Sequence, residues 1–221
     1  MENNVQHKKE RLSFATVKRL PTYLRYLKSM EGKCEYISSV TIAEAMNLSA
    51  IQVKKDIAAV SSVEGKPKLG FVLKDIVADM EKLLGYNNMK AAVLVGAGKL
   101  GTTYLSYTGF SKYGITIAAA FDQNQYLWNS EINGIKVYPM DKLKSFVRDN
   151  DIKMGIITVH KDDAQDVCDK LVDAGIRGIV NFAPTHLIVP DGVELQNEDI
   201  AVTLVVLSYK LQNLMDNDNN N

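Results

Sequence analysis

The stretch Ala91-Ala92-Val93-Leu94-Val95-Gly96-Ala97-Gly98-Lys99-Leu100-Gly101 decides the fold of this chain. An apolar run followed by glycines spaced G-x-G-x-x-G is typical of a buried parallel strand that turns tightly into a helix. We expect Gly96 to permit the turn, Gly98 to let the backbone touch a pyrophosphate, and Gly101 to let the helix pack close to the strand. The phosphates would lie at the helix N-terminus, where free N–H groups bind anions. Residues 96–101 therefore predict a dinucleotide-binding site.

An acidic residue follows the next apolar run, at the distance from the glycines that such a site requires. Residues 115–121 predict a second strand, and Asp122 ends it. In dinucleotide-binding folds an acid about 20 residues beyond the glycines accepts hydrogen bonds from ribose hydroxyls. A carboxylate there repels a 2′-phosphate. We therefore expect NAD(H), rather than NADP(H), as the cofactor.

The rest of this half alternates strands with helices. We expect three helices: one from the glycines to about residue 110, one at 141–148 with Asp141 as its cap, and one at 163–174. The expected strands lie at 135–138, after a turn at 133–134, and at 154–159 and 178–181. This alternation predicts a parallel sheet with helices on both faces. Ligands bind beyond the carboxyl ends of such strands, which adds these candidate cofactor contacts: Thr158, Val159, His160, Asn181, Phe182 and Pro184.

His160 raises the alternative of an enzyme, because a histidine near a nicotinamide can shuttle a proton during hydride transfer. The sequence shows no acid–base partner for it, and residues 89–221 leave no room for a substrate domain. We therefore expect no catalytic residue and a protein that is not an enzyme. Phe182 is open to two interpretations, a core aromatic residue or one that packs near a ligand.

The N-terminal region predicts a helix-turn-helix. Ser13 is a candidate N-cap for a helix from Phe14, which Pro21 should kink or restart. Its apolar face is expected to contain Val17, Leu20, Leu24 and Leu27. Two short helices should follow, at 39–46 with a Ser38 cap and at 50–60 with a Ser49 cap, joined by a tight turn at Asn47-Leu48.

The helix at 50–60 separates its residues onto two faces. Ala50, Val53, Ile57 and Val60 share the apolar face, whereas Gln52, Lys55 and Ala59 share the other, with Lys54 at its margin. Lysine and glutamine can reach phosphates and base edges in a DNA major groove, although a merely solvated helix face would carry the same residues. The glycine-flanked stretch 64–71 favours DNA, because it predicts a β-wing whose Lys66 and Lys68 would contact phosphates. The candidate DNA contacts are Ser49, Gln52, Lys54, Lys55, Lys66 and Lys68.

Composition and charge agree with two domains of different function. Residues 1–88 carry 14 Lys and Arg against 10 Asp and Glu, while residues 89–221 carry 12 Lys and Arg against 16 Asp and Glu. The charge therefore favours binding of a polyanion by residues 1–88 only. No run has the length of a membrane span, and the N-terminus lacks the apolar stretch of a signal peptide, so we expect a cytoplasmic protein. Cys34 and Cys168 show no metal-ligand spacing, and we expect them to be reduced and no metal to be bound.

The segment after residue 197 predicts a partner subunit. Residues 200–214 form a helix with apolar side chains around nearly its whole circumference, more than one small domain can cover. An earlier helix, at 73–84, ends at Gly85 and connects the two domains. The polar tail 216–221 is expected to be disordered.

Several motifs, in the same order and over nearly the whole chain, resemble the Rex family, bacterial redox-sensing repressors that respond to the NADH/NAD⁺ balance. The matching stretches are Lys18-Arg19-Leu20-Pro21-Thr22-Tyr23-Leu24-Arg25-Tyr26-Leu27, Ser49-Ala50, Lys54-Lys55-Asp56, Val95-Gly96-Ala97-Gly98-Lys99-Leu100-Gly101, Ala119-Ala120-Phe121-Asp122 and Asn181-Phe182-Ala183-Pro184. The resemblance implies that Phe182 packs near the nicotinamide and that the last helix is exchanged across a homodimer.

The chain departs from this family in four places. Members usually carry two arginines in place of Lys54 and Lys55, an aromatic residue in place of Ile57, a wing rich in glycine and aromatic residues in place of 60–65, and asparagine in place of Lys99. The first three lie on the side expected to face DNA. They leave open a divergent paralogue with weak or altered DNA binding.

Together these observations predict an α/β protein with four parts: an N-terminal winged helix-turn-helix domain at 1–88, a Rossmann-type NAD(H)-binding domain at 89–197, a C-terminal dimerisation helix at 198–215, domain-swapped as the resemblance implies, and the tail 216–221. We expect a homodimeric repressor that binds operator DNA and is released by NADH. The alternatives are a small NAD-dependent oxidoreductase, a CoA-binding domain, or a redox-sensing paralogue without DNA binding. Asp122 argues against CoA, whose 3′-phosphate it would repel.

Overall fold

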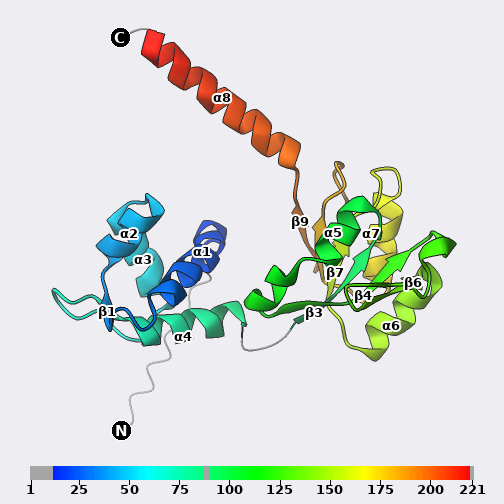
Figure 1. The fold of residues 1–221 in the computed structure, drawn as a ribbon, viewed down its shortest axis with the longest axis horizontal. Helices are drawn as coiled ribbons and strands as arrows, with labels where there is room; N and C mark the ends of the chain where they lie inside the picture. The colour runs from blue at the N-terminus through cyan, green and yellow to red at the C-terminus, as the bar shows by residue number, and fades with distance from the viewer. Residues whose placement is uncertain (1–11, 87–89, 220–221) are drawn as a thin grey trace. The chain divides into compact units, whose positions relative to one another are not determined.

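The computed structural model describes residues 12–86 and 90–219 (Figure 1). The chain divides into two compact units, residues 1–88 and 89–221. Within the described residues, no helix combines the length and the apolar content needed to cross a membrane.

The N-terminal unit is a winged helix-turn-helix, as predicted. Its elements are α1 (Phe14–Met30), β1 (Tyr36–Ile37), α2 (Ser39–Met46), α3 (Ala50–Val60), β2 (Phe71–Val72) and α4 (Leu73–Leu84). The strands β1 and β2 pair antiparallel, and Asn47 makes the turn between α2 and α3 in the left-handed region, with φ 52°. One apolar core joins the helices and includes Leu24, Ile42, Val53, Ile57 and Met80. Gly85 ends α4 as predicted, also with positive φ.

Helix α1 begins as predicted but does not restart at Pro21. The backbone N–H of Thr16 donates to the Ser13 hydroxyl at 3.1 Å, which confirms the cap. The helix is continuous from Phe14 to Met30. Residues on both sides of Pro21, Leu20 and Leu24, are fully buried, and we infer that this packing offsets the hydrogen bond that proline cannot make. Val17, expected on the buried face, is 38% exposed.

The second unit is built on a seven-stranded sheet of order β5-β6-β4-β3-β7-β8-β9. The strands are β3 (Lys90–Val95), β4 (Ile115–Asp122), β5 (Glu131–Ile132), β6 (Ile135–Pro139), β7 (Met154–Ile157), β8 (Gly178–Asn181) and β9 (Glu194–Asn197). All neighbouring pairs are parallel except β5 and β6, which form a hairpin at the predicted Asn133-Gly134 turn.

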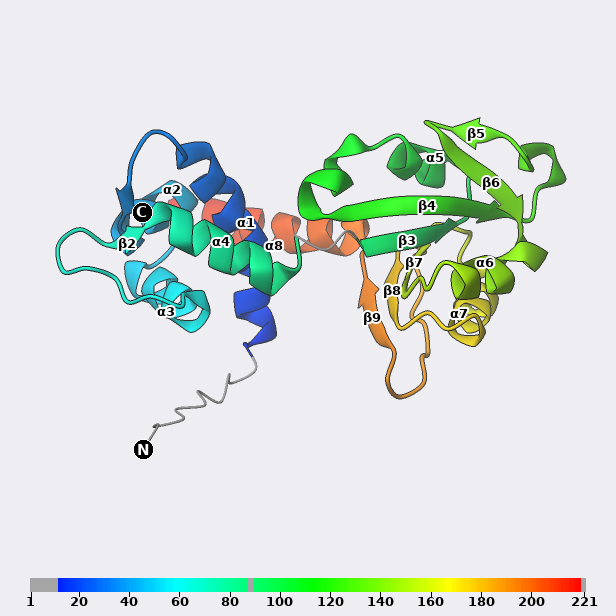
Figure 2. The ribbon, with the colours of Figure 1, turned by 90° about the horizontal axis from the view of Figure 1, so that it is seen from below.

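Helices cover both faces of this sheet, as Figure 2 shows. Helix α5 (Lys99–Leu105) packs on the face that contains Ala92 and Leu94. Helices α6 (Leu143–Asp149) and α7 (Ala164–Asp173) pack on the face that contains Val93 and Val95. Alternate residues of the central strand β3 therefore belong to two separate cores, as expected for a doubly covered parallel sheet.

Two sequence expectations in this unit are wrong, and one strand was missed. Helix α5 ends at Leu105 rather than near Phe110, because the chain turns back into a 3₁₀ segment, Thr108–Tyr113, and the rings of Tyr107 and Phe110 pack edge to face 5.0 Å apart. Asp141 caps no α-helix, since it lies in the 3₁₀ turn Met140–Lys142. The edge strand β9 was not predicted, because its sequence is mostly polar and backbone pairing with β8 defines it.

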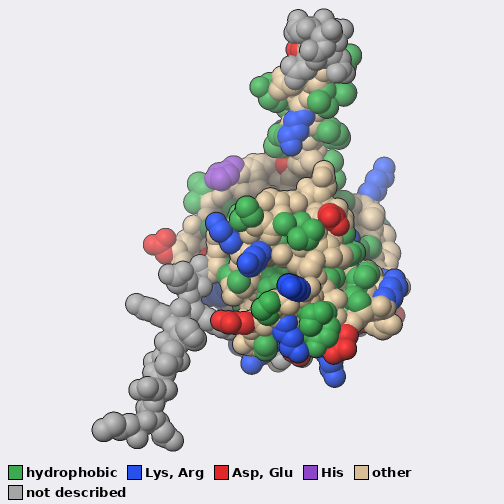
Figure 3. Space-filling view, turned by 90° about the vertical axis from the view of Figure 1, so that its left-hand side faces the viewer, with side chains coloured by type: hydrophobic (Ala, Val, Ile, Leu, Met, Phe, Trp, Pro, Cys, Tyr) green, Lys and Arg blue, Asp and Glu red, His purple; other side chains and the backbone are tan. Residues whose placement is uncertain are grey.

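In the last helix, α8 (Ile200–Asn219), all side chains of residues 200–216 are exposed. Its large apolar side chains between Ile200 and Met215 are 48–70% exposed, and Figure 3 shows them protruding along the helix. The helix continues to Asn219, so the expected disorder is wrong for residues 216–219. Residues 220–221, and the polar leader at 1–11, lie outside the described residues.

Candidate functional site

The glycine loop between β3 and α5 has the geometry that its spacing predicted. Gly96 has φ +100°, and a Cβ there would lie 2.9 Å from the Thr158 carbonyl oxygen. A Cβ on Gly101 would overlap the carbonyl oxygen of Gly96, so the start of α5 packs directly against the turn. Gly98 faces open space, because a Cβ there would meet no atom of the described residues within 4 Å. The loop therefore leaves one side of its backbone free for a ligand.

Thr158, directly beyond β7, supports this loop. Its hydroxyl donates to the Gly96 carbonyl at 2.7 Å and lies 3.1 Å from the Val95 carbonyl. The backbone N–H of Thr158 also donates to Val95. The side chain of Val159 lies against Gly96 from the same segment. Both candidate residues thus shape the glycine loop from the neighbouring strand.

Asp122 lies at the end of β4 and is bound to the glycine loop. Its Oδ2 accepts a hydrogen bond from the Ala97 N–H at 2.6 Å, and its Oδ1 accepts one from the Asn124 N–H at 2.8 Å. The indole N–H of Trp128 donates to the Asp122 carbonyl at 2.9 Å. Each carboxylate oxygen keeps a further lone pair, so a ribose diol can still donate to it.

A cavity of about 340 Å³ joins these residues. Its wall includes the predicted Gly96, Gly98, Asp122, Thr158, Val159 and His160, together with residues not predicted, Gln123, Met140, Asp163, Asp166, Val167 and Lys170. Gln123 and Met140 lie just beyond the strands β4 and β6, a position that could have identified them. The exposed Lys99 and Leu100 do not line the cavity.

His160 does have an acidic neighbour, contrary to expectation. Its Nδ1 lies 3.0 Å from Oδ2 of Asp162, two residues along the chain, and both side chains are exposed. The sequence showed this aspartate but not the local turn that brings it to the ring. An exposed pair of this kind gives no buried acid–base relay.

Asn181, the last residue of β8, is bonded to the loop that follows the strand. Asn181 is fully buried, and its amide donates to the carbonyls of Ala183 and Thr185 and to Oδ1 of Asn197, while its own Oδ1 accepts from Ala183 N–H. The Asn181 side chain therefore shapes the loop, and it is fully buried rather than exposed at the cavity wall. The sequence selected Asn181 as a candidate because a polar residue at the carboxyl end of a parallel strand is in the position of a ligand contact.

Phe182 and Pro184 lie apart from the cavity wall. Phe182 is partly buried, and its ring stacks on Tyr104 of α5 with centroids 4.5 Å apart, a contact the sequence did not predict. Pro184 is exposed in a separate hollow with His186, Glu198 and Asp199. The aromatic pair lies at the C-terminal end of α5, with its two rings tilted by 36°.

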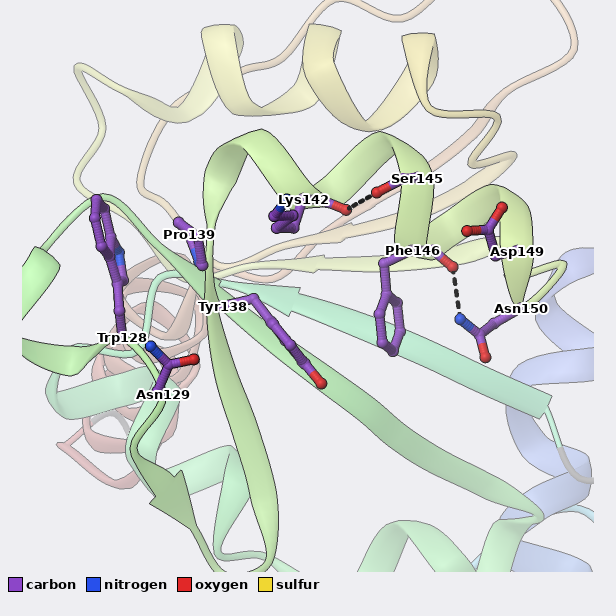
Figure 4. A pocket seen from close by; sticks show the side chains of 9 residues that line it. All are labelled: Trp128, Asn129, Tyr138, Pro139, Lys142, Ser145, Phe146, Asp149 and Asn150. Carbon is purple, nitrogen blue, oxygen red and sulfur yellow. Dashed lines mark hydrogen bonds between the residues drawn. The ribbon is translucent and has the colours of Figure 1, made fainter.

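A second hollow, of about 430 Å³, lies between β6 and α6 (Figure 4). Trp128, Tyr138 and Phe146 supply its aromatic surface. The Ser145 hydroxyl donates to the Lys142 carbonyl, and the Asn150 amide donates to the Phe146 carbonyl. No candidate cofactor residue lines this hollow, so it is separate from the site at the glycine loop.

In the N-terminal unit, α3 exposes one regular face. Its exposed residues are Ile51, Lys54, Lys55, Ala58 and Ala59, while Val53 and Ile57 are fully buried. Ser49 precedes the helix at the N-cap position, but its side chain makes no capping hydrogen bond. Figure 3 shows apolar and basic side chains side by side on the N-terminal unit.

Gln52 is less available than predicted, because Asp56 holds it. The Gln52 Nε2 donates to Oδ1 of Asp56 at 2.9 Å. Asp56 is 2% exposed and also accepts from Arg19 Nε at 2.7 Å, Arg19 Nη2 at 2.9 Å, the Tyr23 hydroxyl at 2.9 Å and the Thr16 hydroxyl at 3.2 Å. This network, which joins α3 to α1, was not predicted, because its donors lie 33–40 residues away in the sequence.

The network changes the ionisation of its members. Burial alone would raise the pKa of Asp56, but hydrogen bonds from Arg19, Tyr23 and Gln52 outweigh it and hold that pKa below its ordinary value. Burial, together with the hydrogen bond to Asp56, raises the pKa of Tyr23 to about 12. Asp56 is therefore a carboxylate, and Tyr23 a neutral phenol, at neutral pH.

The predicted wing is a short turn closed by a bridge between Lys66 and Gly70. The Lys66 ammonium donates to the Tyr36 hydroxyl at 2.9 Å, and this hydrogen bond raises the pKa of Lys66. Lys68 is exposed at the tip with φ 66°. Both lysines keep N–H groups that can reach a phosphate.

Neither cysteine lines the cavity at the glycine loop. Cys34 and Cys168 carry free thiols, and burial raises the pKa of Cys168. Among the residues that the structure describes, no group of three or more His, Cys, Asp or Glu side chains is arranged to hold a metal ion.

Two family models match this chain, one in each unit. The model described as "Putative DNA-binding protein N-terminus" matches residues 11–58, which contain α1, α2 and most of α3. The model described as "CoA binding domain" matches residues 87–185, which contain the glycine loop.

Curated relatives match nearly the whole chain. A redox-sensing transcriptional repressor Rex of Treponema denticola is 41% identical over 197 residues, 89% of this chain and 93% of the relative. A redox-sensing transcriptional repressor Rex of Carboxydothermus hydrogenoformans is 40% identical over 199 residues, 90% of this chain and 95% of the relative.

Solved structures agree with these relatives. RSP, described as a Rex-family repressor, matches 93% of this chain and 96% of its own with a TM-score of 0.82 and 32% identity. RSP in complex with β-NADH matches 96% of this chain and 100% of its own, with a TM-score of 0.84 and 31% identity. RSP with β-NAD⁺ and operator DNA matches 96% of this chain and 99% of its own, with a TM-score of 0.86 and 32% identity.

Proposed function

The chain belongs to the Rex family of redox-sensing transcriptional repressors, and from this we propose that it binds operator DNA as a homodimer and is released from it by NADH. The observation that carries the proposal is the likeness to a repressor solved both with NADH and with NAD⁺ and operator DNA. The proteins it resembles are regulators. We extend this to the present chain and propose that it is a sensor without catalytic residues.

For the cofactor, the glycine loop and Asp122 are the main candidate contacts. The open side of Gly98 admits a pyrophosphate, whose charge the N–H groups at the start of α5 favour. Lys99, the first residue of α5, adds a positive charge near it. Asp122, already oriented by Ala97, would accept from the ribose hydroxyls. This arrangement favours NAD(H) over NADP(H) and over CoA, although a CoA-binding model matches the same residues.

For the dimer, α8 supplies the surface. A helix with apolar side chains exposed on every side is unstable in water unless other surfaces cover it. We propose that residues 198–215 pack on the partner subunit in exchange for the partner's own helix. Residues 1–88 and 89–197 would remain the DNA-binding and NAD(H)-binding domains.

For the switch, the cofactor must change the spacing of two DNA-binding domains. Half-sites on DNA recur at about one helical turn, roughly 34–36 Å, so a dimer with another spacing cannot fill both. NADH can shift this equilibrium only if it binds the two dimer arrangements with different affinity. Its reduced ring is neutral and packs more easily than the cationic oxidised ring against an apolar surface such as Phe182. We therefore expect NADH to bind more tightly than NAD⁺.

A binding experiment tests the proposal. The measurements are a gel shift with DNA from upstream of the chain's own gene, with and without NADH, and NADH affinity with and without saturating DNA. By linkage, DNA must weaken NADH binding by the factor by which NADH weakens DNA binding. Equal NADH affinity in both conditions contradicts the switch, and failure to bind DNA at all supports the paralogue without DNA binding. NADPH, CoA and the Phe182→Ala variant serve as comparisons.

A further inference from the structure

Ile51 is the large apolar residue that α3 exposes most. It is 70% exposed in the first turn of the helix, although Val53 and Ile57 of the same helix are fully buried. It belongs to the exposed face that also carries Lys54 and Lys55. The core does not use Ile51, so its apolar side chain is available to a partner.

The charge around Ile51 identifies the kind of partner. Lys54 and Lys55 lie three and four residues further along, within one turn of the same face. Two cations beside an apolar side chain suit a DNA major groove, where phosphates line the edges and bases form the floor. An exposed apolar residue in the first turn is well placed for base contacts, because the N-terminal residues of a recognition helix reach the base edges.

Gln52, the next residue, is less available than Ile51. Its side chain is half-buried, and one of the two N–H groups on its Nε2 donates to the buried Asp56. Only its other N–H group and its carbonyl remain for a base. Ile51 is 70% exposed and is the large apolar side chain that the first turn of α3 offers to a base.

We propose that Ile51 reads thymine in the operator, by packing against the 5-methyl group that thymine alone presents in the major groove. This inference rests on the proposed function, because it assumes that α3 enters DNA. It predicts a preference for an A·T pair at one position of each half-site. The lysines would supply affinity without this preference.

The test removes the methyl group alone. A duplex selected from a random pool by the unmodified protein is remade with deoxyuridine in place of each thymine in turn. Burying one methyl group corresponds to about a fourfold change in affinity, so one substitution in both half-sites should weaken binding about 15-fold. With Ile51→Ala the same substitution should have a much smaller effect, because the shorter side chain keeps little contact with the methyl group. Ile51→Val, which keeps branched methyl groups, should retain part of the discrimination.

A matched control uses Ile188, which is 76% exposed in the other unit. Ile188→Ala should discriminate thymine from uracil as the unmodified protein does. If Ile51→Ala discriminates equally well, another residue reads the methyl group and the inference is wrong, although the proposed function stands. If no duplex is selected from the pool, the proposed function fails and the inference with it.

Discussion

Replacing Asp56 with alanine tests the network that joins α3 to α1. The change leaves Arg19 without its buried partner and removes an acceptor from Tyr23, Thr16 and Gln52. Breaking a buried ion pair by removing one partner costs about 3–5 kcal/mol. Because the Arg19 side chain is still 27% exposed, water compensates part of this, and we expect the lower end, about 3 kcal/mol.

A loss of this size is large for a small unit. Domain stabilities are about 5–15 kcal/mol, and 1 kcal/mol shifts Tm by about 4–8 °C in a domain of this length. We therefore expect the N-terminal unit of Asp56→Ala to unfold at least about 12 °C earlier. Helical circular dichroism would report this transition, while the fluorescence of Trp128, the single tryptophan, follows the other unit.

The control is Asp75→Ala, which removes an exposed carboxylate from the first turn of α4 in the same unit. It should cost about 0.3–1 kcal/mol through the helix dipole alone. In addition, Arg19→Ala combined with Asp56→Ala should cost less than the sum of the two single changes. A Tm shift for Asp56→Ala no larger than that for Asp75→Ala would refute the structural role given to this network.

Four further predictions follow from the same structure. In a fluorescence titration, Asp122→Ala should weaken NADH binding and reduce the ratio of NADH affinity to NADPH affinity. If the unmodified protein binds NADH and NADPH with equal affinity, Asp122 does not select NAD(H). Lys55→Ala should lower the slope of log affinity against log salt by about one, a change that Lys136→Ala, in the other unit, should not produce. Because the pKa of Tyr23 is raised to about 12, its contribution to the free energy of unfolding is present below about pH 10 and is lost as pH rises towards 12. The free energy of unfolding of Tyr23→Phe should therefore fall less between about pH 10 and pH 12 than that of the unmodified protein. Leu204→Glu should convert the dimer to monomer in light scattering, and Tyr126→Glu, at a residue 87% exposed outside α8, should not.

The sequence predicted those parts of the fold that depend on local rules. The glycine loop, the left-handed turns and the caps of α1 and α2 each follow from a few neighbouring residues. Strict spacing requirements made Gly96 and Gly101 predictable in detail. The position of Asp122 followed in the same way, because strand length fixes its distance from the loop.

Features that depend on distant residues were missed or misjudged. Pro21 was expected to kink or restart α1, but the helix is continuous through it, and we infer that burial of Leu20 and Leu24 offsets the hydrogen bond that proline cannot make. The hydrogen bond from the Asn181 amide to Asn197 of β9 was missed, because it joins two strands 16 residues apart in the sequence. The Asp56 network joins two helices far apart in the sequence, and no local sequence pattern predicts these hydrogen bonds. The edge strand β9 depends on backbone pairing, which side-chain composition does not encode.

The exposed apolar surface of α8 has a genetic consequence. The pairing that we propose through this helix would not require an intact α3, so a chain with a damaged recognition helix should still combine with undamaged copies. Each mixed dimer would present only one working DNA-binding domain and would fill only one half-site. A gene copy altered in α3 alone should therefore act as a dominant negative, and deleting α8 from that copy should make it recessive.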